Sequence, residues 1–167
     1  MFLLVTLLNT AKAQTTPASV LKEWERAKLY TKEYLDAMPE KDYAFKPTPE
    51  MRSFADQMLH LGADNYVFTA AALGEKFPAG MDQLEKTSEK TKSSVTKNVL
   101  DSYDFVIEAL KKLTAAQLTE KVKLFDRFEL SREQAFEKGF EHQTHHRGQT
   151  TVYLRLAGTK PPAEKLF

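Results

Sequence analysis

Four segments of the chain carry apolar side chains at three- and four-residue intervals, the spacing that places them on one face of an α-helix. The clearest stripe comprises Val95, Val99, Tyr103, Val106 and Leu110. The pattern predicts long helices over about 17–38, 53–74, 92–113 and 131–157. We found no strand-like alternation of any length, so the prediction is an all-α fold, a four-helix bundle with one longer crossover loop.

Residues that start or stop helices mark the ends of these segments. Ser53 is a suitable N-cap for the second helix, with Asp56 three residues on. Ser131 and Gln134 have the spacing of a capping box at the start of the fourth. Prolines in "YAFKPTPEM" impose an extended connection after the first helix, and a polar loop, "EKFPAGMDQLEKTSEK", follows the second. Thr114 caps a short turn, "TAAQL", between the third and fourth helices.

Length and composition limit the classes of protein that remain. The 167 residues fit one domain with a buried core. The 24 Lys and Arg residues nearly balance the 23 Asp and Glu residues without a long basic block, which argues against a nucleic-acid partner. The absence of cysteine excludes disulfides, thiolate zinc sites, iron–sulfur clusters and a cysteine nucleophile. Any metal must therefore be held by His, Asp or Glu.

The first residues, "MFLLVTLLNTAKAQTT", resemble a secretory leader. An apolar run precedes a small-x-small site at Ala11 and Ala13, which predicts a signal peptide over 1–13 and a single mature domain over 14–167, periplasmic or secreted. No Lys or Arg precedes the run, so an apolar first helix in a cytoplasmic protein is the alternative. A bilayer span takes about 20 apolar residues, and no segment reaches that length, so we predict no membrane span.

Three of the four histidines, His142, His145 and His146, lie close together in the fourth predicted helix. A helix advances about 100° per residue, so His142 and His146 share one face with Gly139. The same arc carries the apolar side chains and reads as the buried face. His145 falls on the other side, toward polar positions, and is predicted to be a surface residue.

The fourth histidine, His60, lies in a second helix that is apolar nearly all round, and it is expected to be buried. Two histidines at i and i+4 plus a third from a neighbouring helix can form a three-nitrogen site for zinc, nickel, iron or manganese. Hydrogen-bonded core histidines are the alternative. Asp64, one turn after His60, is a candidate general base or orienter of a ligand, and an ordinary polar contact is its alternative.

Each residue near the histidines has two possible interpretations, a role in the site or an ordinary packing role. Arg147, Gln149 and Tyr153 could serve the site or simply pack, and Tyr153 in particular fits a core aromatic with a satisfied hydroxyl. Other chemistries fail specific tests. No Glu-x-x-His pair supports a di-iron carboxylate bundle, and neither HExxH, GxSxG nor a phosphate-binding glycine loop occurs.

The stretch "HQTHHRGQ", read as His-x-x-x-His-Arg-Gly-Gln, resembles the signature of the DinB-like family. The resemblance extends over about 17–162, including "SFADQMLHLGADN" and "LTAAQL". It implies a four-helix bundle, often a homodimer, with a divalent metal bound by three histidines that map onto His60, His142 and His146. Some relatives are thiol-dependent transferases or isomerases that use low-molecular-weight thiols, and the family name does not imply DNA binding.

These observations predict a divalent-metal-binding protein, expected to be a metal-dependent enzyme that acts on a small molecule. A hydrolase and a thiol-dependent transferase both fit, because a metal-bound water or thiol becomes a better nucleophile when its pKa is lowered. A metal-stabilised stress or binding protein without catalysis is one alternative. A bundle that binds no metal is the other.

Overall fold

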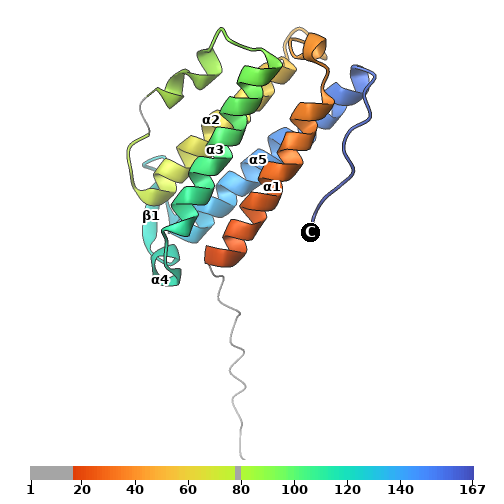
Figure 1. Cartoon of the computed structure of the whole chain (residues 1–167). Coiled ribbons are helices and arrows are strands. Elements are labelled where there is room, and N and C mark those ends of the chain that lie inside the picture. Colours follow the sequence, from red (N-terminus) through yellow and green to blue (C-terminus); the bar gives the residue numbers. More distant parts are fainter. Residues whose placement is uncertain (1–16, 78–79) are drawn as a thin grey trace, which may run out of the picture.

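Four long helices lie side by side and form the predicted bundle (Figure 1). The computed structural model describes residues 17–77 and 80–167, so the predicted leader over 1–13 lies outside the described residues. The long helices are α1 (Pro17–Ala37), α2 (Phe54–Leu73), α3 (Lys92–Lys111) and α5 (Arg132–Leu156). Each begins and ends close to the residues that the sequence predicts.

Side-chain caps fix where the helices start. The Ser53 hydroxyl accepts a hydrogen bond from the backbone N–H of Asp56, and the Asp56 carboxylate in turn accepts from the Ser53 backbone, which completes a capping box. Ser131 and Gln134 form the same arrangement at the start of α5. Gly74 ends α2 at φ 70°, a left-handed conformation that glycine adopts without steric cost. Local sequence therefore determines the helix ends.

The order of the helices around the bundle differs from their order in the chain. α2 packs against α3 and α5, whereas α1 packs against α3 and more sparsely against α5. α2 and α3 run in the same direction, so the chain returns along the bundle between them (Figure 1). This return is the predicted longer crossover, and it contains the short helix η2 (Met81–Lys86). A second short helix, η1 (Glu40–Asp42), follows α1.

The interior is apolar and draws on all four long helices. The predicted stripe of α3 is fully buried, from Val95 to Leu110, and Trp24, Phe54 and Phe136 supply large side chains from α1, α2 and α5. Burial of apolar surface is the main force that stabilises such a bundle. Among the described helices, none is long and apolar enough to cross a membrane.

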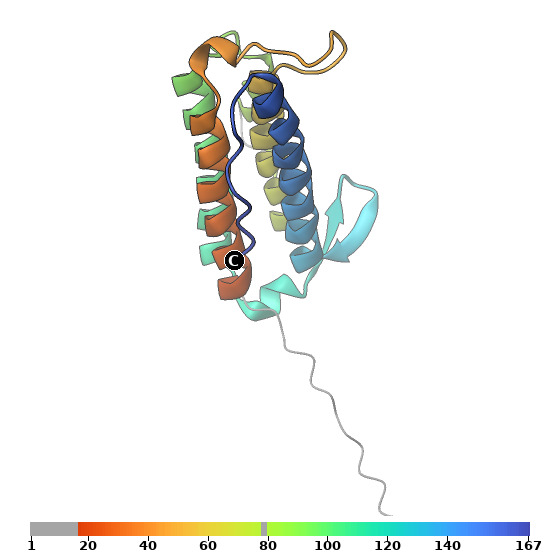
Figure 2. The same cartoon turned by 90° about the vertical axis from the view of Figure 1, so that its right-hand side faces the viewer.

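A β-hairpin between α3 and α5 corrects the prediction that the chain lacks strands. After the short helix α4 (Ala115–Leu118), β1 (Lys121–Leu124) pairs in antiparallel register with β2 (Phe128–Ser131). Val122 and Leu124 are buried and alternate with exposed lysines, but a four-residue alternation was too short to recognise as a strand. The hairpin projects beside the start of α5 (Figure 2).

The C-terminal segment after α5 turns back along α1 (Figure 2). An Arg26 guanidinium N–H donates to the Lys165 carbonyl at 2.6 Å, and the Lys165 ammonium pairs with Glu33. These contacts place the tail on a different side of α5 from the hairpin.

Candidate metal centre

The antiparallel packing of α2 and α5 brings together three histidines that are far apart in the sequence. The ring centroid of His146 lies 4.5 Å from that of His60 and 4.3 Å from that of His142. The His60 and His142 centroids are 5.3 Å apart. One nitrogen from each ring lies within 4.8 Å of the others, a spacing that a single ion could bridge. The structure thus gathers the three histidines that the sequence selected.

The helical phase of α5 is confirmed. His146 is buried and His142 is mostly buried, whereas His145 is exposed on the outer side of the helix. His60 is also mostly buried, since its side chain is 15% exposed. The remaining exposure arises because the crossover loop covers His60 only from one side, through the partly exposed side chain of Glu85.

Each of the three imidazoles is held through one ring nitrogen by a different side chain. His142 Nε2 lies 2.9 Å from an Asp64 carboxylate oxygen. His60 Nδ1 lies 3.1 Å from a Glu85 carboxylate oxygen, and His146 Nδ1 lies 2.7 Å from the side-chain amide of Gln57. Carboxylates and amides in this position typically fix the ring orientation of metal-ligating histidines. The opposite nitrogen of each ring remains for a ligand.

The nitrogen that remains on His142 tests whether the site suits a metal. His142 Nδ1 is buried and has no hydrogen-bond partner within the described part of the chain. A buried nitrogen without a partner costs stability, and native structures seldom tolerate one. Because Nε2 faces the Asp64 carboxylate at 2.9 Å, Nδ1 is the nitrogen left to offer a lone pair to a transition ion. The donor set therefore fits a nitrogen-ligated divalent cation.

The charges around the cluster favour a cation as well. The Asp64 and Glu85 carboxylates both lie next to His60, with Asp64 3.6 Å from His60 Nε2. His60, Asp64 and Glu85 also form a second group whose ligand atoms are within 4.8 Å of one another. Two carboxylates can balance the charge of a divalent ion held by neutral imidazoles.

The protonation of His146 suits a ligand. Burial, together with the nearby His142 and His60 rings, lowers the pKa of His146 to about 3. The imidazole is consequently neutral at physiological pH, which is the form that binds metal.

The other residues singled out from the sequence have separate roles. Gln149 accepts a hydrogen bond from Gln57 and lies 2.7 Å from His145, so it connects the cluster to the surface. Tyr153 is buried and donates to the Arg52 carbonyl at 3.0 Å, the core role foreseen as its alternative. Arg147 is buried and lies over the Tyr30 ring on α1.

Sequence reasoning missed two residues that hold the histidines. Gln57 shares a helix face with His60, and that spacing was the signal that could have identified it. Glu85 comes from η2 in the crossover loop, and no local pattern connects it to His60. Asp64 contacts His142 on the neighbouring helix, a position that fits both a residue that orients the ring and a polar contact between helices.

The chain is similar to proteins of one known family. A family model described as the DinB superfamily matches residues 23–150. A DinB-like protein from Bacillus cereus has a similar structure, with a TM-score of 0.80 and 21% identity over 91% of this chain and 99% of that one. A DinB-like protein from Bacillus subtilis gives a TM-score of 0.67 and 19% identity over 89% and 96% of the two chains. A conserved protein from Enterococcus faecalis gives 0.67 and 15% over 88% and 98%. A comparison with curated proteins gave no match.

Proposed function

Because the chain belongs to the DinB superfamily, we propose that it is a metal-dependent enzyme acting on a small molecule, with His60, His142 and His146 as ligands of a divalent transition ion. The observation that carries the proposal is the buried Nδ1 of His142, which lacks a partner although it lies beside two further imidazoles. Hydrogen-bonded core histidines do not leave such an atom.

The side chains around the three histidines orient their rings for metal binding. The Asp64 carboxylate faces Nε2 of His142 at 2.9 Å and the Glu85 carboxylate is hydrogen-bonded to Nδ1 of His60, so each ring can present its other nitrogen. Gln57 holds His146 through Nδ1. If the Gln57 and Gln149 amides both turn so that each exchanges its nitrogen for its oxygen, Gln149 donates to Gln57, Nδ1–H of His146 donates to Gln57, and Nε2 of His146 carries the free lone pair.

Three protein ligands are typical of catalytic rather than structural zinc sites, which are usually closed by four. A bound ion supplies a Lewis acid that lowers the pKa of a water or a thiol in the open position. Asp64 borders both His60 and His142 and is the candidate to accept the proton. Hydrolysis and thiol transfer both require this pair of functions.

The proposal is tested by element analysis of the purified, untagged chain, followed by cobalt substitution. We expect one ion per chain, and we expect 2-mercaptoethanol to change the visible spectrum of the cobalt form, because an open position admits a thiolate. A chain that takes up no divalent ion would contradict metal binding. If neither the thiol nor azide changes the visible spectrum of the cobalt form, the result would instead favour a metal-stabilised protein without catalysis.

Asp64→Ala is expected to weaken metal binding by about 10- to 100-fold, the usual effect of removing a side chain that orients a ligating histidine. Asp64→Asn should weaken it less, because the amide oxygen still accepts from His142. Isothermal titration with zinc measures both. Asp101→Asn is the control, since Asp101 pairs only with the exposed Lys97 on α3. Equal affinity in wild type and Asp64→Ala would show that Asp64 does not orient a ligand.

Removal of the metal by a chelator is expected to abolish activity and to leave the bundle folded. The core side chains Val99, Tyr103, Phe136 and Leu154 are buried by helix packing, and the partly buried Phe140 packs against them without a metal contact. Far-ultraviolet circular dichroism before and after chelation measures the helix content. A large loss of helical signal would show that the ion stabilises the fold, as in structural zinc sites.

A further inference from the structure

An apolar pocket of about 600 Å³ lies between α2, α5 and the β-hairpin and opens beside the candidate metal centre. Its apolar walls are Phe68, Leu124, Phe125, Phe128 and Leu130. His142 belongs both to this pocket and to the histidine cluster. The volume lies within the range of small-molecule sites, which are mostly apolar with a few polar groups.

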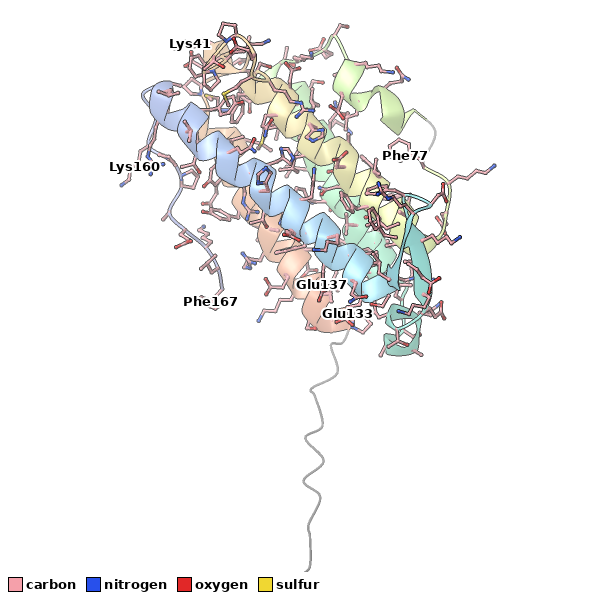
Figure 3. All side chains as sticks on the ribbon, turned by 180° about the vertical axis from the view of Figure 1, so that it is seen from behind. Lys41, Phe77, Glu133, Glu137, Lys160 and Phe167 are labelled. Atoms are coloured by element: carbon pink, nitrogen blue, oxygen red, sulfur yellow. The ribbon has the colours of Figure 1, made fainter. Side chains whose placement is uncertain are left out.

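A line of rings leads from the hairpin to His142. The Phe125 ring lies 5.3 Å from that of Phe68, which lies 5.3 Å from the His142 ring. Figure 3 views the molecule from the side of α5, where Glu133 and Glu137 mark the first turns of the helix beside the hairpin. The pocket therefore reaches the histidine cluster through His142, which belongs to both.

The turn of the hairpin holds Phe125 in an unfavourable backbone conformation. Phe125 and Asp126 have φ of 55° and 54°, in the left-handed region that glycine and asparagine adopt most readily. A bulky residue there is an outlier, and its ring is still 51% exposed. Neither turn chemistry nor burial explains a phenylalanine at this position, whereas a role in the pocket does.

The rim of the pocket carries charges that cancel. Lys138 and Glu141 line it and pair with each other at 2.8 Å. The remaining polar lining is imidazole from His142 and His145. A ligand group without net charge is consequently favoured over a strongly ionic one.

We propose that this pocket binds an uncharged aromatic or branched aliphatic group of the substrate, so that the neighbouring reactive atom reaches the histidine cluster. The inference rests on the proposed function and specifies its substrate class: an apolar small molecule whose reacting group is adjacent to its hydrophobic part. Because the Phe125 side chain lines this pocket, replacing it should lower the affinity for the apolar ligand.

The test uses N-phenyl-1-naphthylamine, a neutral apolar fluorescent probe, titrated into the full chain without metal. We expect binding of one probe per chain, weakened at least tenfold in Phe125→Asn and in Phe125→Gly. Both replacements accept the left-handed backbone, so urea denaturation midpoints should be equal to or higher than that of wild type. The control is Phe167→Asn, because Phe167 is fully exposed at the end of the tail (Figure 3).

The outcomes are separable from those of the metal proposal. Cobalt added to the wild-type complex is expected to quench the bound probe, because His142 is shared by both sites. Probe binding that depends on Phe125 in a chain that takes up no metal would retain the pocket and reject the metal centre. Probe affinity unchanged by both Phe125 variants, or absent in wild type, would overturn the pocket. If both variants markedly lower the urea midpoint, Phe125 serves the packing of the fold, and this result would also overturn the pocket proposal.

Discussion

Replacing His146 with alanine is expected to abolish metal binding, whereas replacing His145 with alanine leaves it nearly intact. The two residues are adjacent in sequence and identical in type, but His146 is buried against His60 and His142, and His145 is exposed on the opposite side of α5. The loss of one of three ligands removes one of the three nitrogens, and the neighbouring Asp64 and Glu85 carboxylates offer only oxygen donors in its place. The His145 ring lies edge-on to His146, with their centroids 5.0 Å apart, but its Nε2 faces the Gln149 amide at 2.7 Å and it does not belong to the group of three histidines.

Element analysis after dialysis against zinc measures this prediction directly, and circular dichroism confirms that both variants are folded. His60→Ala and His142→Ala should behave like His146→Ala, because each of these rings supplies one nitrogen to the same group. Equal losses in the His145 and His146 variants, or a loss confined to His145→Ala, would contradict the assigned ligands.

Arg147→Ala is expected to lower the free energy of unfolding by roughly 2 to 4 kcal/mol, the cost of deleting a large buried side chain together with its cation–π contact. Arg147 is 5% exposed, its guanidinium lies 4.5 Å from the Tyr30 ring centroid, and it donates to the Gln143 side-chain oxygen at 2.9 Å. Tyr103 donates to the same oxygen at 2.8 Å, so Arg147 belongs to a buried polar network that links α1, α3 and α5.

Urea denaturation measures this change, and two further variants interpret it. Arg147→Met should cost less than Arg147→Ala, because it retains volume and removes a buried charge that has no carboxylate partner within the described residues. Arg155→Ala, at an exposed position of the same helix, should change stability by no more than about 0.5 kcal/mol. A small effect of Arg147→Ala with unchanged helix content would show that the network contributes little to stability.

The histidine cluster shows which part of a site is predictable from local geometry. His142 and His146 share a face because the rotation per residue of a helix is fixed, and the same rule separates His145 from them. The holding partners follow no such rule. Asp64 reaches His142 across the interface of two helices, and Glu85 reaches His60 from the crossover loop.

The hairpin, in contrast, is a feature that the sequence pattern did not reveal. Strands of four residues offer too little alternation to distinguish them from a loop, so their pairing became visible only in three dimensions. The pocket depends on that pairing, because Leu124, Phe125 and Phe128 come from the hairpin whereas Phe68 comes from α2.

Local patterns in the sequence predicted the four long helices, their capped ends and the inward face of each, because hydrogen bonds, caps and side-chain periodicity act over only a few residues. The packing of the helices, in contrast, set α2 antiparallel to α5, brought Asp64, Glu85 and Gln57 to the three imidazoles, and formed the apolar pocket beside His142. These features depend on how helix faces pack against one another. Such packing is decided by the shapes of many side chains that are distant in sequence, and no local pattern records it.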